Sequence, residues 1–270
     1  MPKKVNLSII IVDYRAKEEL ARCLASIGKN SGWQIIVVDN NRHNRGFAKA
    51  SNLGAKKARG EYLLFLNPDT VVAKNSIQLL LGKIKQNKNI GIIAPQLTDS
   101  KNKAYRSYSR QPSMLSAPIV FSFINTLLKN NFVSQKYWYK NSSLSKEKNV
   151  EAVTGAALMI KKKLFEEIGG FDERFFMYWE DIDLCRRVLA TGKLICFYPA
   201  AKIMHFGGRS TLGVKTKASK WFKKSRFLFF AKHFGNIYGL LLEIFLRLFE
   251  SWRFLAILTL AAWYLVNTYR

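Results

Sequence analysis

The fold is decided by a stretch that runs Tyr62-Leu63-Leu64-Phe65-Leu66-Asn67-Pro68-Asp69. An unbroken apolar row is typical of a strand buried in a parallel sheet, and the Asn-Pro-Asp that follows it is typical of a turn. Two earlier stretches repeat this order. An apolar run at 7–12 ends at Asp13-Tyr14, and another at 35–38 ends at Asp39-Asn40. The sequence therefore predicts strands that each end in polar side chains.

Helical patterns fill the intervals between these strands. Apolar residues recur at helical spacing in 20–27, 48–58 and 75–86, and a fourth strand-like run follows at 90–94. Alternating strands and helices predict an α/β fold with a parallel, doubly wound sheet. Ligands of such sheets bind beyond the carboxyl ends of the strands, where these polar side chains are expected.

The second half of the chain is less regular. Residues 99–112 are polar and rich in Arg, Tyr and Ser, and 114–128 has the character of a helix or a mobile flap. The elements expected after these are ordered structure over 150–160, helices over 162–168 and from 181 to Thr191-Gly192, and strands over 194–198 and 201–205.

The composition limits the class of protein and its partners. With 270 residues and 49% hydrophobic residues, the chain can form one large domain, or one domain with an appendage. A formal net charge of +26 favours anionic partners, which include nucleic acid, anionic lipid and phosphorylated substrates. Charge alone does not choose among them.

The cysteines favour a reducing compartment, and the N-terminal run bears on whether a signal peptide is present. Cys23, Cys185 and Cys196 lie far apart, so their spacing predicts neither a zinc site nor a disulfide framework. A cytoplasmic location fits this pattern. The apolar run at 7–12 is short and ends at Asp13, so we expect a first strand rather than a signal peptide.

Two of the strand-end acids have chemical uses. Asp39 can accept hydrogen bonds from uracil, thymine or ribose, although an acid in this place can also be a helix cap or turn former. Asp69 can supply one oxygen ligand to Mg²⁺ or Mn²⁺, with phosphate oxygens and water completing the shell. An ordinary turn before a helix is the alternative for Asp69.

A second cluster of acids follows a run of bulky apolar residues. The stretch reads Phe176-Met177-Tyr178-Trp179-Glu180-Asp181-Ile182-Asp183. Helix capping accounts for one of these acids but not for all of them beside aromatic residues. Apolar surroundings shift the pKa of an acid toward the range of a general base. His205, at a predicted strand end, can ligate the same metal as Asp69 or can be a hydrogen-bonded structural histidine.

Several motifs, taken in order, resemble the family 2 glycosyltransferases with a GT-A fold. They run Asn44-Arg45-Gly46-Phe47-Ala48-Lys49-Ala50-Ser51-Asn52-Leu53-Gly54, then 60–70, Val153-Thr154-Gly155-Ala156, 169–187, and His205 with Gly208 and Ser210. The likeness covers about residues 6–235. It is greatest to the rhamnosyltransferase-like branch, which acts in bacterial surface-polysaccharide synthesis.

This resemblance implies a Rossmann-like nucleotide-diphospho-sugar transferase, with a mixed sheet flanked by helices. The roles it implies are nucleotide-sugar binding by Asp13, Tyr14, Asp39, Asn67 and Asp69, metal binding by Asp69 and His205, and catalysis by Asp181 as general base with Glu180 beside it. Asn67 departs from the first Asp of the family's Asp-x-Asp motif. Asp183 is expected to be structural, near the start of the helix.

The implied reaction is direct displacement with inversion at the anomeric carbon, assisted by Mg²⁺ or Mn²⁺. The implied donor is deoxythymidine-diphosphate rhamnose or a uridine-diphosphate sugar. The implied acceptor is a polyprenyl-diphosphate-linked or growing glycan at the membrane.

The C-terminal part has a different character. We expect a glycosyltransferase domain over 1–235 and an amphipathic or apolar helical segment over 236–270. The apolar runs at 240–248 and 254–266 are each too short for a span, and Glu243, Arg247, Glu250 and Arg253 interrupt the longer stretch that they form together. This favours interfacial or re-entrant helices over a membrane span. With the basic-aromatic residues of 215–230, they predict peripheral attachment to the anionic inner face of the plasma membrane. A packed helix pair with solvated lysines is the alternative.

Two other classes of protein remain as alternatives. The positive charge is compatible with a nucleic-acid-binding protein, but no helix-turn-helix, zinc-finger or RNP pattern is present in the sequence. A nucleotidyltransferase on a similar fold would need a Gly-rich loop with Arg or Lys after the first strand, and none is evident. We therefore expect no nucleic-acid partner.

Overall fold

The computed structural model describes residues 5–28, 30–128, 130–207 and 215–248. They form two compact units. The first consists of the described residues of Met1–Gln111 and Ser142–Ser225, and the second of those of Pro112–Asn141 and Arg226–Arg270. All predicted site residues lie in the first unit. The functional boundary expected at residue 235 stays a prediction.

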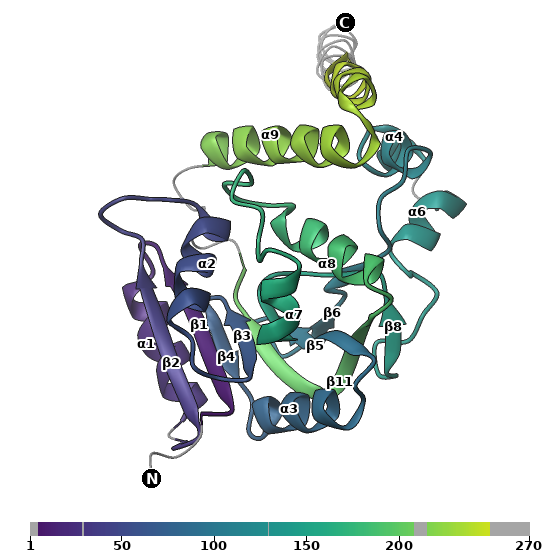
Figure 1. Ribbon diagram of the computed structural model, residues 1–270. Coiled ribbons are helices and arrows are strands. Elements are labelled where there is room, and N and C mark those ends of the chain that lie inside the picture. Colours follow the sequence, from purple (N-terminus) through teal and green to yellow (C-terminus); the bar gives the residue numbers. More distant parts are fainter. Residues whose placement is uncertain (1–4, 29, 129, 208–214, 249–270) are drawn as a thin grey trace, which may run out of the picture. The chain divides into compact units, whose positions relative to one another are not determined.

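A mixed sheet forms the centre of the first unit (Figure 1). Among the described residues its strands run in the order β2-β1-β3-β10-β5-β11-β4, with β6 beside β5 and β8 beside β11. Their bounds are β1 (Leu7–Asp13), β2 (Trp33–Asp39), β3 (Tyr62–Leu66), β4 (Thr70–Val72), β5 (Ile90–Thr98), β6 (Ala104–Tyr105), β8 (Lys148–Val150), β10 (Ala157–Lys161) and β11 (Leu194–His205). A separate pair is formed by β7 (Tyr108–Ser109) and β9 (Ala152–Val153).

Helices cover both faces of this sheet. On one face, α1 (Lys17–Ile27) and α3 (Ser76–Gln86) contribute buried side chains to a core with alternate strand residues. On the other face lie α2 (Phe47–Lys57), α7 (Lys162–Glu167) and α8 (Glu180–Ala190). The helices expected from the sequence at 48–58, 75–86, 162–168 and from 181 are thus confirmed to within a few residues.

Successive side chains of β1 point to opposite faces of the sheet, so this one strand packs against helices on both faces. Leu7, Ile9 and Ile11 belong to the core with α1 and α3, whereas Ile10 faces α2. The opposing helix residue is Gly54, where an added Cβ would lie 2.5 Å from Ile10 Cγ2. The missing side chain lets α2 approach the sheet. Each fully buried isoleucine contributes about 1.5–3 kcal/mol relative to exposure, so β1 is a major stabilising element.

The mixed sheet implied by the family resemblance is confirmed, whereas the parallel, doubly wound sheet expected from strand–helix alternation is correct only in part. β1 pairs in parallel with β2 and β3, and β5 with β11, but β10 runs antiparallel between β3 and β5. Strand–helix alternation stops at β5. The chain that follows β5 enters β10 from the opposite end of the sheet, so β10 is antiparallel to its neighbours. The two short strands expected over 194–198 and 201–205 form one strand, β11, with an irregularity between Tyr198 and Lys202.

The second unit is helical in its described residues. It contains α4 (Ser116–Val120), α5 (Ile124–Leu127), α6 (Phe132–Tyr137), the chain from 226 in α9 (Lys215–Phe234), and helical residues 236–248. Arg226 donates from Nε and Nη2 to Glu243 at 2.6 and 3.1 Å, and both side chains are almost fully buried. This ion pair ties α9 to the following helix.

Helices α4 and α5 now account for the segment 114–128, for which a helix or a flap was expected. None of the helices in the described residues combines the length and apolar character that a membrane crossing requires. The expected apolar run over 254–266 lies outside the described residues.

Candidate active site

The ends of β1 and β2 bring two carboxylates together. Asp13 lies opposite Asp39 in the parallel register. The side-chain amide of Asn41 donates to Asp13 Oδ2 and to Asp39 Oδ1, each at 2.9 Å. Asn41 Oδ1 in turn accepts from the Arg15 backbone N–H at 2.7 Å. One amide thus bridges both acids and fixes the loop that follows each strand.

Asp39 is exposed and remains ionised. The backbone N–H of Asn41 and then its side-chain amide hold the pKa of Asp39 below its ordinary value. Its other neighbours include the positive charges of Arg42 and Arg45. An exposed carboxylate of this kind can accept hydrogen bonds from a ligand. Tyr14 lies beside this pair, and the Arg15 guanidinium is 5.4 Å from the centre of its ring.

The turn after β3 forms a second polar group. Asp69 is buried, and its Oδ1 lies 3.3 Å from His205 Nε2. His205 reaches it because β11 pairs antiparallel with β4, which sets His205 opposite Thr70. Asn67 Nδ2 lies 3.5 Å from the same imidazole nitrogen. The three residues predicted separately from the sequence are therefore brought together at one edge of the sheet.

Tyr105, which was not identified from the sequence, contacts the other ring nitrogen of His205. Tyr105 Oη lies 2.8 Å from His205 Nδ1. Burial, and then the charge of Asp69, raises the pKa of Tyr105 to about 12, so the phenol stays neutral. A hydrogen bond at the nitrogen that faces away from a metal fixes the ring orientation of a metal-ligating histidine, and Tyr105 can act in this way on His205.

The Asp69–His205 pair fits part of a divalent cation's shell. Two ligands at neighbouring positions of an octahedral cation lie about 3 Å apart, which is close to the 3.3 Å between Asp69 Oδ1 and His205 Nε2. In the described residues, no group of three or more His, Cys, Asp or Glu side chains is arranged to hold a metal ion. The pair therefore suits a cation that takes its remaining ligands from phosphate oxygens and water.

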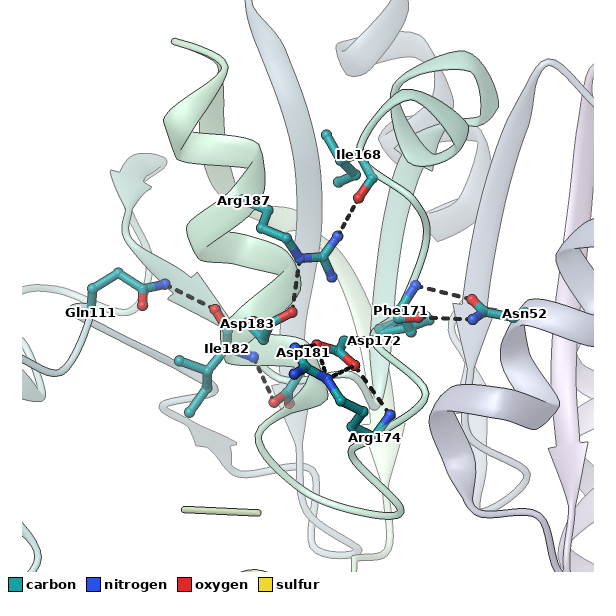
Figure 2. Close-up of polar contacts among 10 residues, drawn as sticks. All are labelled: Asn52, Gln111, Ile168, Phe171, Asp172, Arg174, Asp181, Ile182, Asp183 and Arg187. Carbon is teal, nitrogen blue, oxygen red and sulfur yellow. Dashed lines mark hydrogen bonds and ion pairs between the residues drawn. The ribbon is translucent and has the colours of Figure 1, made fainter. Parts of the chain in front are cut away.

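The acid pair begins α8. Asp181 Oδ2 accepts from the Gly155 backbone N–H and Asp181 Oδ1 from the Ile182 backbone N–H, both at 2.8 Å (Figure 2 shows the second). Glu180 is buried, and its Oε2 has no hydrogen-bond partner among the described residues. Asp181 is only half-buried. The first acid is thus enclosed by protein, and the second is fixed by backbone donors.

Burial sets the protonation of this pair. It raises the pKa of Glu180 well above the ordinary value, and the negative charge of Asp181 adds to the shift. Burial also raises the pKa of Asp181, although its backbone donors, Gly155 first, oppose the shift. Two coupled carboxylates in such a place favour a state in which one carries a proton. Glu180 is the better candidate to hold it, because Asp181 accepts from two backbone donors, whereas Glu180 Oε2 has no hydrogen-bond partner among the described residues.

The third acid of this cluster has a structural role. Asp183 is fully buried, and its Oδ2 accepts from Arg187 Nε at 2.8 Å (Figure 2). Arg187 also donates to the Ile168 carbonyl at 2.7 Å. The ion pair lies within α8, and the hydrogen bond from Arg187 to Ile168 fastens α8 to the end of α7.

Two adjacent backbone groups join the acid pair to the turn after β3. Gly155 donates to Asp181, and the next carbonyl, that of Ala156, accepts from the Asn67 N–H at 2.9 Å. Asp181 is therefore linked through one dipeptide to the turn that carries Asp69. The Asp181 carboxylate and the turn of Asn67 and Asp69 are thus connected through two consecutive residues.

The glycine-containing motif at 44–54 fixes the segment before the acid pair. Gly46 has φ +81°, and an added Cβ would lie 2.2 Å from the Phe176 carbonyl oxygen. The next residue, Phe47, donates its N–H to that oxygen at 2.7 Å. Asn52 exchanges hydrogen bonds with the Phe171 backbone at 2.8 and 3.0 Å (Figure 2). The motif therefore holds residues 171–176 through hydrogen bonds to their backbone, and we call these contacts the clamp of the 44–54 motif.

Sequence patterns missed two supporting residues. Asn41 was overlooked because a polar residue after a strand end reads as an ordinary turn. Tyr105 lies in the polar segment 99–112, where the richness in tyrosine was the only signal. Both act through residues that the sequence did identify.

Comparisons with known proteins agree with this geometry. A family model described as glycosyltransferase like family 2 matches residues 3–205, which contain every predicted site residue. The chain is 28% identical over 216 residues to the N-acetylglucosaminyl-diphospho-decaprenol L-rhamnosyltransferase of Mycobacterium tuberculosis, with 78% of this chain and 68% of that protein covered. It is 27% identical over 251 residues to the rhamnosyltransferase WbbL of Escherichia coli, with 83% and 92% covered.

A solved structure shares the fold. The crystal structure of GalNAc-T7 with UDP, GalNAc and Mn²⁺ superposes with a TM-score of 0.52 at 16% sequence identity. The alignment covers 76% of this chain and 44% of that one. At this identity the likeness concerns the fold, which is GT-A-like as the sequence motifs implied.

Glu180→Gln tests the energetic cost of the buried acid. A raised pKa means that folding disfavours the carboxylate, so the parent loses stability as pH rises from the ordinary carboxyl pKa through the raised one. The neutral amide avoids this loss. We expect the melting temperature of Glu180→Gln, measured by calorimetry, to exceed that of the parent by an amount that grows as the pH rises above the ordinary carboxyl range.

The matched control is Glu166→Gln, because the Glu166 side chain is exposed. This control should follow the parent curve. Parallel curves for the parent and Glu180→Gln would contradict the assignment of a raised pKa to Glu180.

Proposed function

Because the chain belongs to glycosyltransferase-like family 2, we propose that it transfers a sugar from a nucleoside diphosphate to a lipid-linked or glycan acceptor in cell-surface glycan synthesis. The proposed sugar is rhamnose, carried by deoxythymidine diphosphate, with a uridine-diphosphate sugar as the second donor to test. The support is the rhamnosyltransferase activity of the two relatives from Mycobacterium tuberculosis and Escherichia coli.

One observation carries the proposal. The Gly155–Ala156 dipeptide joins the Asp181 carboxylate to the turn of Asn67 and Asp69. Sugar transfer needs a base for the acceptor hydroxyl and a charged site for the departing diphosphate, on either side of one carbon atom. The dipeptide keeps the candidates for these two tasks at a fixed separation.

In the proposed reaction Asp181 is the general base. It takes the proton from the acceptor hydroxyl, whose oxygen forms a bond to the anomeric carbon. The bond between that carbon and the diphosphate breaks on the opposite face, so the configuration inverts. The pKa of Asp181, raised by burial, brings its basicity closer to neutral pH, which favours proton transfer at the working pH.

Glu180 supports the base without touching the proton that is transferred. Held neutral by burial, it adds no second negative charge at the start of α8. Asp181 keeps its orientation through the N–H groups of Gly155 and Ile182. These donors also restrain its basicity, so that the carboxylate is present near neutral pH.

The donor is proposed to lie across the ends of β1, β2 and β3. Asp39 and Asp13, with Tyr14 beside them, accept hydrogen bonds from the base and ribose. Asn67 and Asp69 lie at the diphosphate, where Asp69 and His205 would hold Mg²⁺ or Mn²⁺. When bound, the cation supplies positive charge beside the leaving diphosphate. GalNAc-T7, which shares the fold, was solved with Mn²⁺ and UDP.

Activity on a donor panel tests the function. We expect the full chain with Mn²⁺ or Mg²⁺ to be stabilised most by deoxythymidine-diphosphate rhamnose in a thermal-shift assay. It should also release the nucleoside diphosphate rather than pyrophosphate. Release of pyrophosphate would instead favour a nucleotidyltransferase, and steep salt-dependent DNA binding without donor binding would favour a nucleic-acid-binding protein.

Asp181→Asn tests the base within the same assay. General-base catalysis contributes about 10²–10⁴-fold, so transfer should fall by that factor while the donor-induced thermal shift stays. The control is Glu61→Gln, which changes a half-exposed carboxylate paired with Lys161 and away from the proposed site. Near-normal transfer by Asp181→Asn would overturn the assignment.

Tyr105→Phe tests the proposed cation site. The substitution keeps the ring and removes only the hydroxyl that contacts His205 Nδ1. We expect Mn²⁺ affinity, measured by electron paramagnetic resonance of the free ion with nucleoside diphosphate present, to fall by about 10–100-fold. Tyr198→Phe, on the same strand as His205, is the control. Equal affinities of the parent and Tyr105→Phe would count against an orienting role.

We further infer that the second unit attaches the enzyme to an anionic membrane, from a cytoplasmic position. Among the described residues, all exposed large hydrophobic side chains but Ile35, Val37 and Leu79 belong to this unit. Exposed apolar patches of this kind are typical of interaction surfaces. The residues 112–141 contain lysines but no Asp or Glu, which favours an anionic partner.

Helical residues 236–248 are the strongest part of this surface. The exposed side chains form one stripe, which consists of Ile237, Leu240, Leu241, Ile244 and Leu248. Leu242 and Leu246 are buried on the other side, next to the ion pair of Glu243. Tyr238 Oη donates to the Met114 carbonyl at 2.6 Å, so the exposed Met114 adjoins the start of this helix. An amphipathic helix of this kind suits the lipid interface.

The double change Leu241→Asp and Ile244→Asp tests the membrane surface in the full chain. Burying one such side chain contributes about 1.5–3 kcal/mol, so binding to phosphatidylglycerol vesicles should fall at least tenfold in a sedimentation assay. Leu79→Asp, an exposed leucine of the first unit, should bind as the parent does. Equal binding of all three proteins would refute the surface. Point changes are preferable to truncation, which would take away the partner of Arg226.

A further inference from the structure

The segment that precedes the acid pair has an unusual backbone. Tyr178 and Trp179 have φ values of 68° and 70°, so two consecutive non-glycine residues have backbone conformations in the left-handed region. That region is disfavoured for residues with a Cβ, and it persists only where the surroundings impose it. Trp179 is also the N-cap residue, directly before the first residue of α8, Glu180. The direction of the first turn of α8, with both acids, thus depends on contacts that hold 176–179.

One side of this segment is held by the clamp of the 44–54 motif. The Phe176 carbonyl accepts from the Phe47 N–H at 2.7 Å. This contact fixes the start of the segment only. The left-handed residues that come next need a second support.

The first half of α9 supplies that support, and it contacts all four residues. The Trp221 ring lies 4.7 Å from the Phe176 ring. The Phe222 ring lies 5.7 Å from Tyr178 and 5.8 Å from Trp179. Ser225 is buried, and its Oγ donates to the Met177 carbonyl at 2.8 Å. These contacts come from little more than one turn of one helix.

We propose that residues 221–225 of α9 position the acid pair, by holding 176–179 so that Tyr178 and Trp179 keep the left-handed conformation that leads into α8. The proposal rests on the proposed transferase function and names a further determinant of the same site. Trp221, Phe222 and Ser225 do not touch Glu180 or Asp181 in any contact given above. They act through the backbone of 176–179, so they are positioning residues.

The proposal has a specific kinetic consequence. If the contacts of α9 with 176–179 are lost, Tyr178 and Trp179 relax toward ordinary φ values and the first turn of α8 shifts. Asp181 then loses its bond from Gly155, which aligns it with the turn of Asp69. On the proposed donor side, at the ends of β1 to β3, Asn41 holds Asp13 and Asp39, and His205 lies beside Asp69. Loosening α9 should therefore lower kcat and leave the donor KM unchanged.

Ser225→Ala is the sharpest test, since it removes one hydroxyl and little volume. The loss of one buried hydrogen bond should lower kcat about threefold to tenfold, with the donor KM within about twofold of the parent. The matched control is Lys224→Ala, an exposed neighbour on the same helix, which should keep the parent kcat.

Trp221→Ala and Trp221→Phe form a second pair. The alanine variant loses the ring contact to Phe176, so kcat should fall about tenfold or more, while phenylalanine keeps an aromatic contact and should restore most of it. Equal loss in both variants would show that the ring contact does not matter.

Amide hydrogen exchange gives a readout that needs no substrate. In Ser225→Ala, exchange at residues 178–183 should rise while exchange in α3 stays as in the parent. If the parent transfers no sugar, the proposed function fails, and the exchange data still decide the positioning role. The positioning role is overturned if kcat and exchange at 178–183 both stay at parent values, or if exchange rises equally in α3.

Discussion

The site depends on one constraint, which is that β1 is buried on both faces and must pair with a strand on each side. Its backbone N–H and C=O groups find partners only in β2 and β3, because no water reaches them. The resulting register aligns the ends of three strands. It sets Asp13 opposite Asp39 and Ile11 opposite Leu66, directly before the turn that carries Asp69. The later strands add to this edge, since β10 is preceded by Gly155–Ala156 and β11 ends at His205.

The acids at this edge are given different environments, and so different chemistry. Asp39 is exposed and hydrogen-bonded, so its charge is maintained. Asp69 is buried beside His205 and suits a cation. The start of α8 exerts two opposing effects on Glu180. The helix dipole favours a negative charge by about 0.3–1 kcal/mol, whereas burying a charge costs several kcal/mol. Burial prevails, which explains why the pKa of Glu180 is raised despite its place at a helix N-terminus.

The segment that leads to the proposed base is locally unfavourable. Two left-handed aromatic residues, Tyr178 and Trp179, are followed by the buried Glu180, whose Oε2 has no hydrogen-bond partner among the described residues. The surroundings offset them. The 44–54 motif, the aromatic residues of α9 and the Asp183–Arg187 ion pair all act on this part of the chain. Strain supported from several sides is typical of functional sites.

The sequence by itself determined the order of most helices and strands, the acids at the strand ends, the acid pair and the family. These are properties of neighbouring residues: apolar runs, helical spacing and short motifs persist in the chain whether or not it is folded. Only the tertiary structure decided the antiparallel direction of β10, the bridging amide of Asn41, the support of His205 by Tyr105 and the contacts of α9 with 176–179. Tyr105 and His205 are 100 residues apart, and Ser225 and Met177 are 48 apart. Contacts over such separations form when buried backbone and side-chain groups find partners across the packed sheet, so no local pattern of residues encodes them.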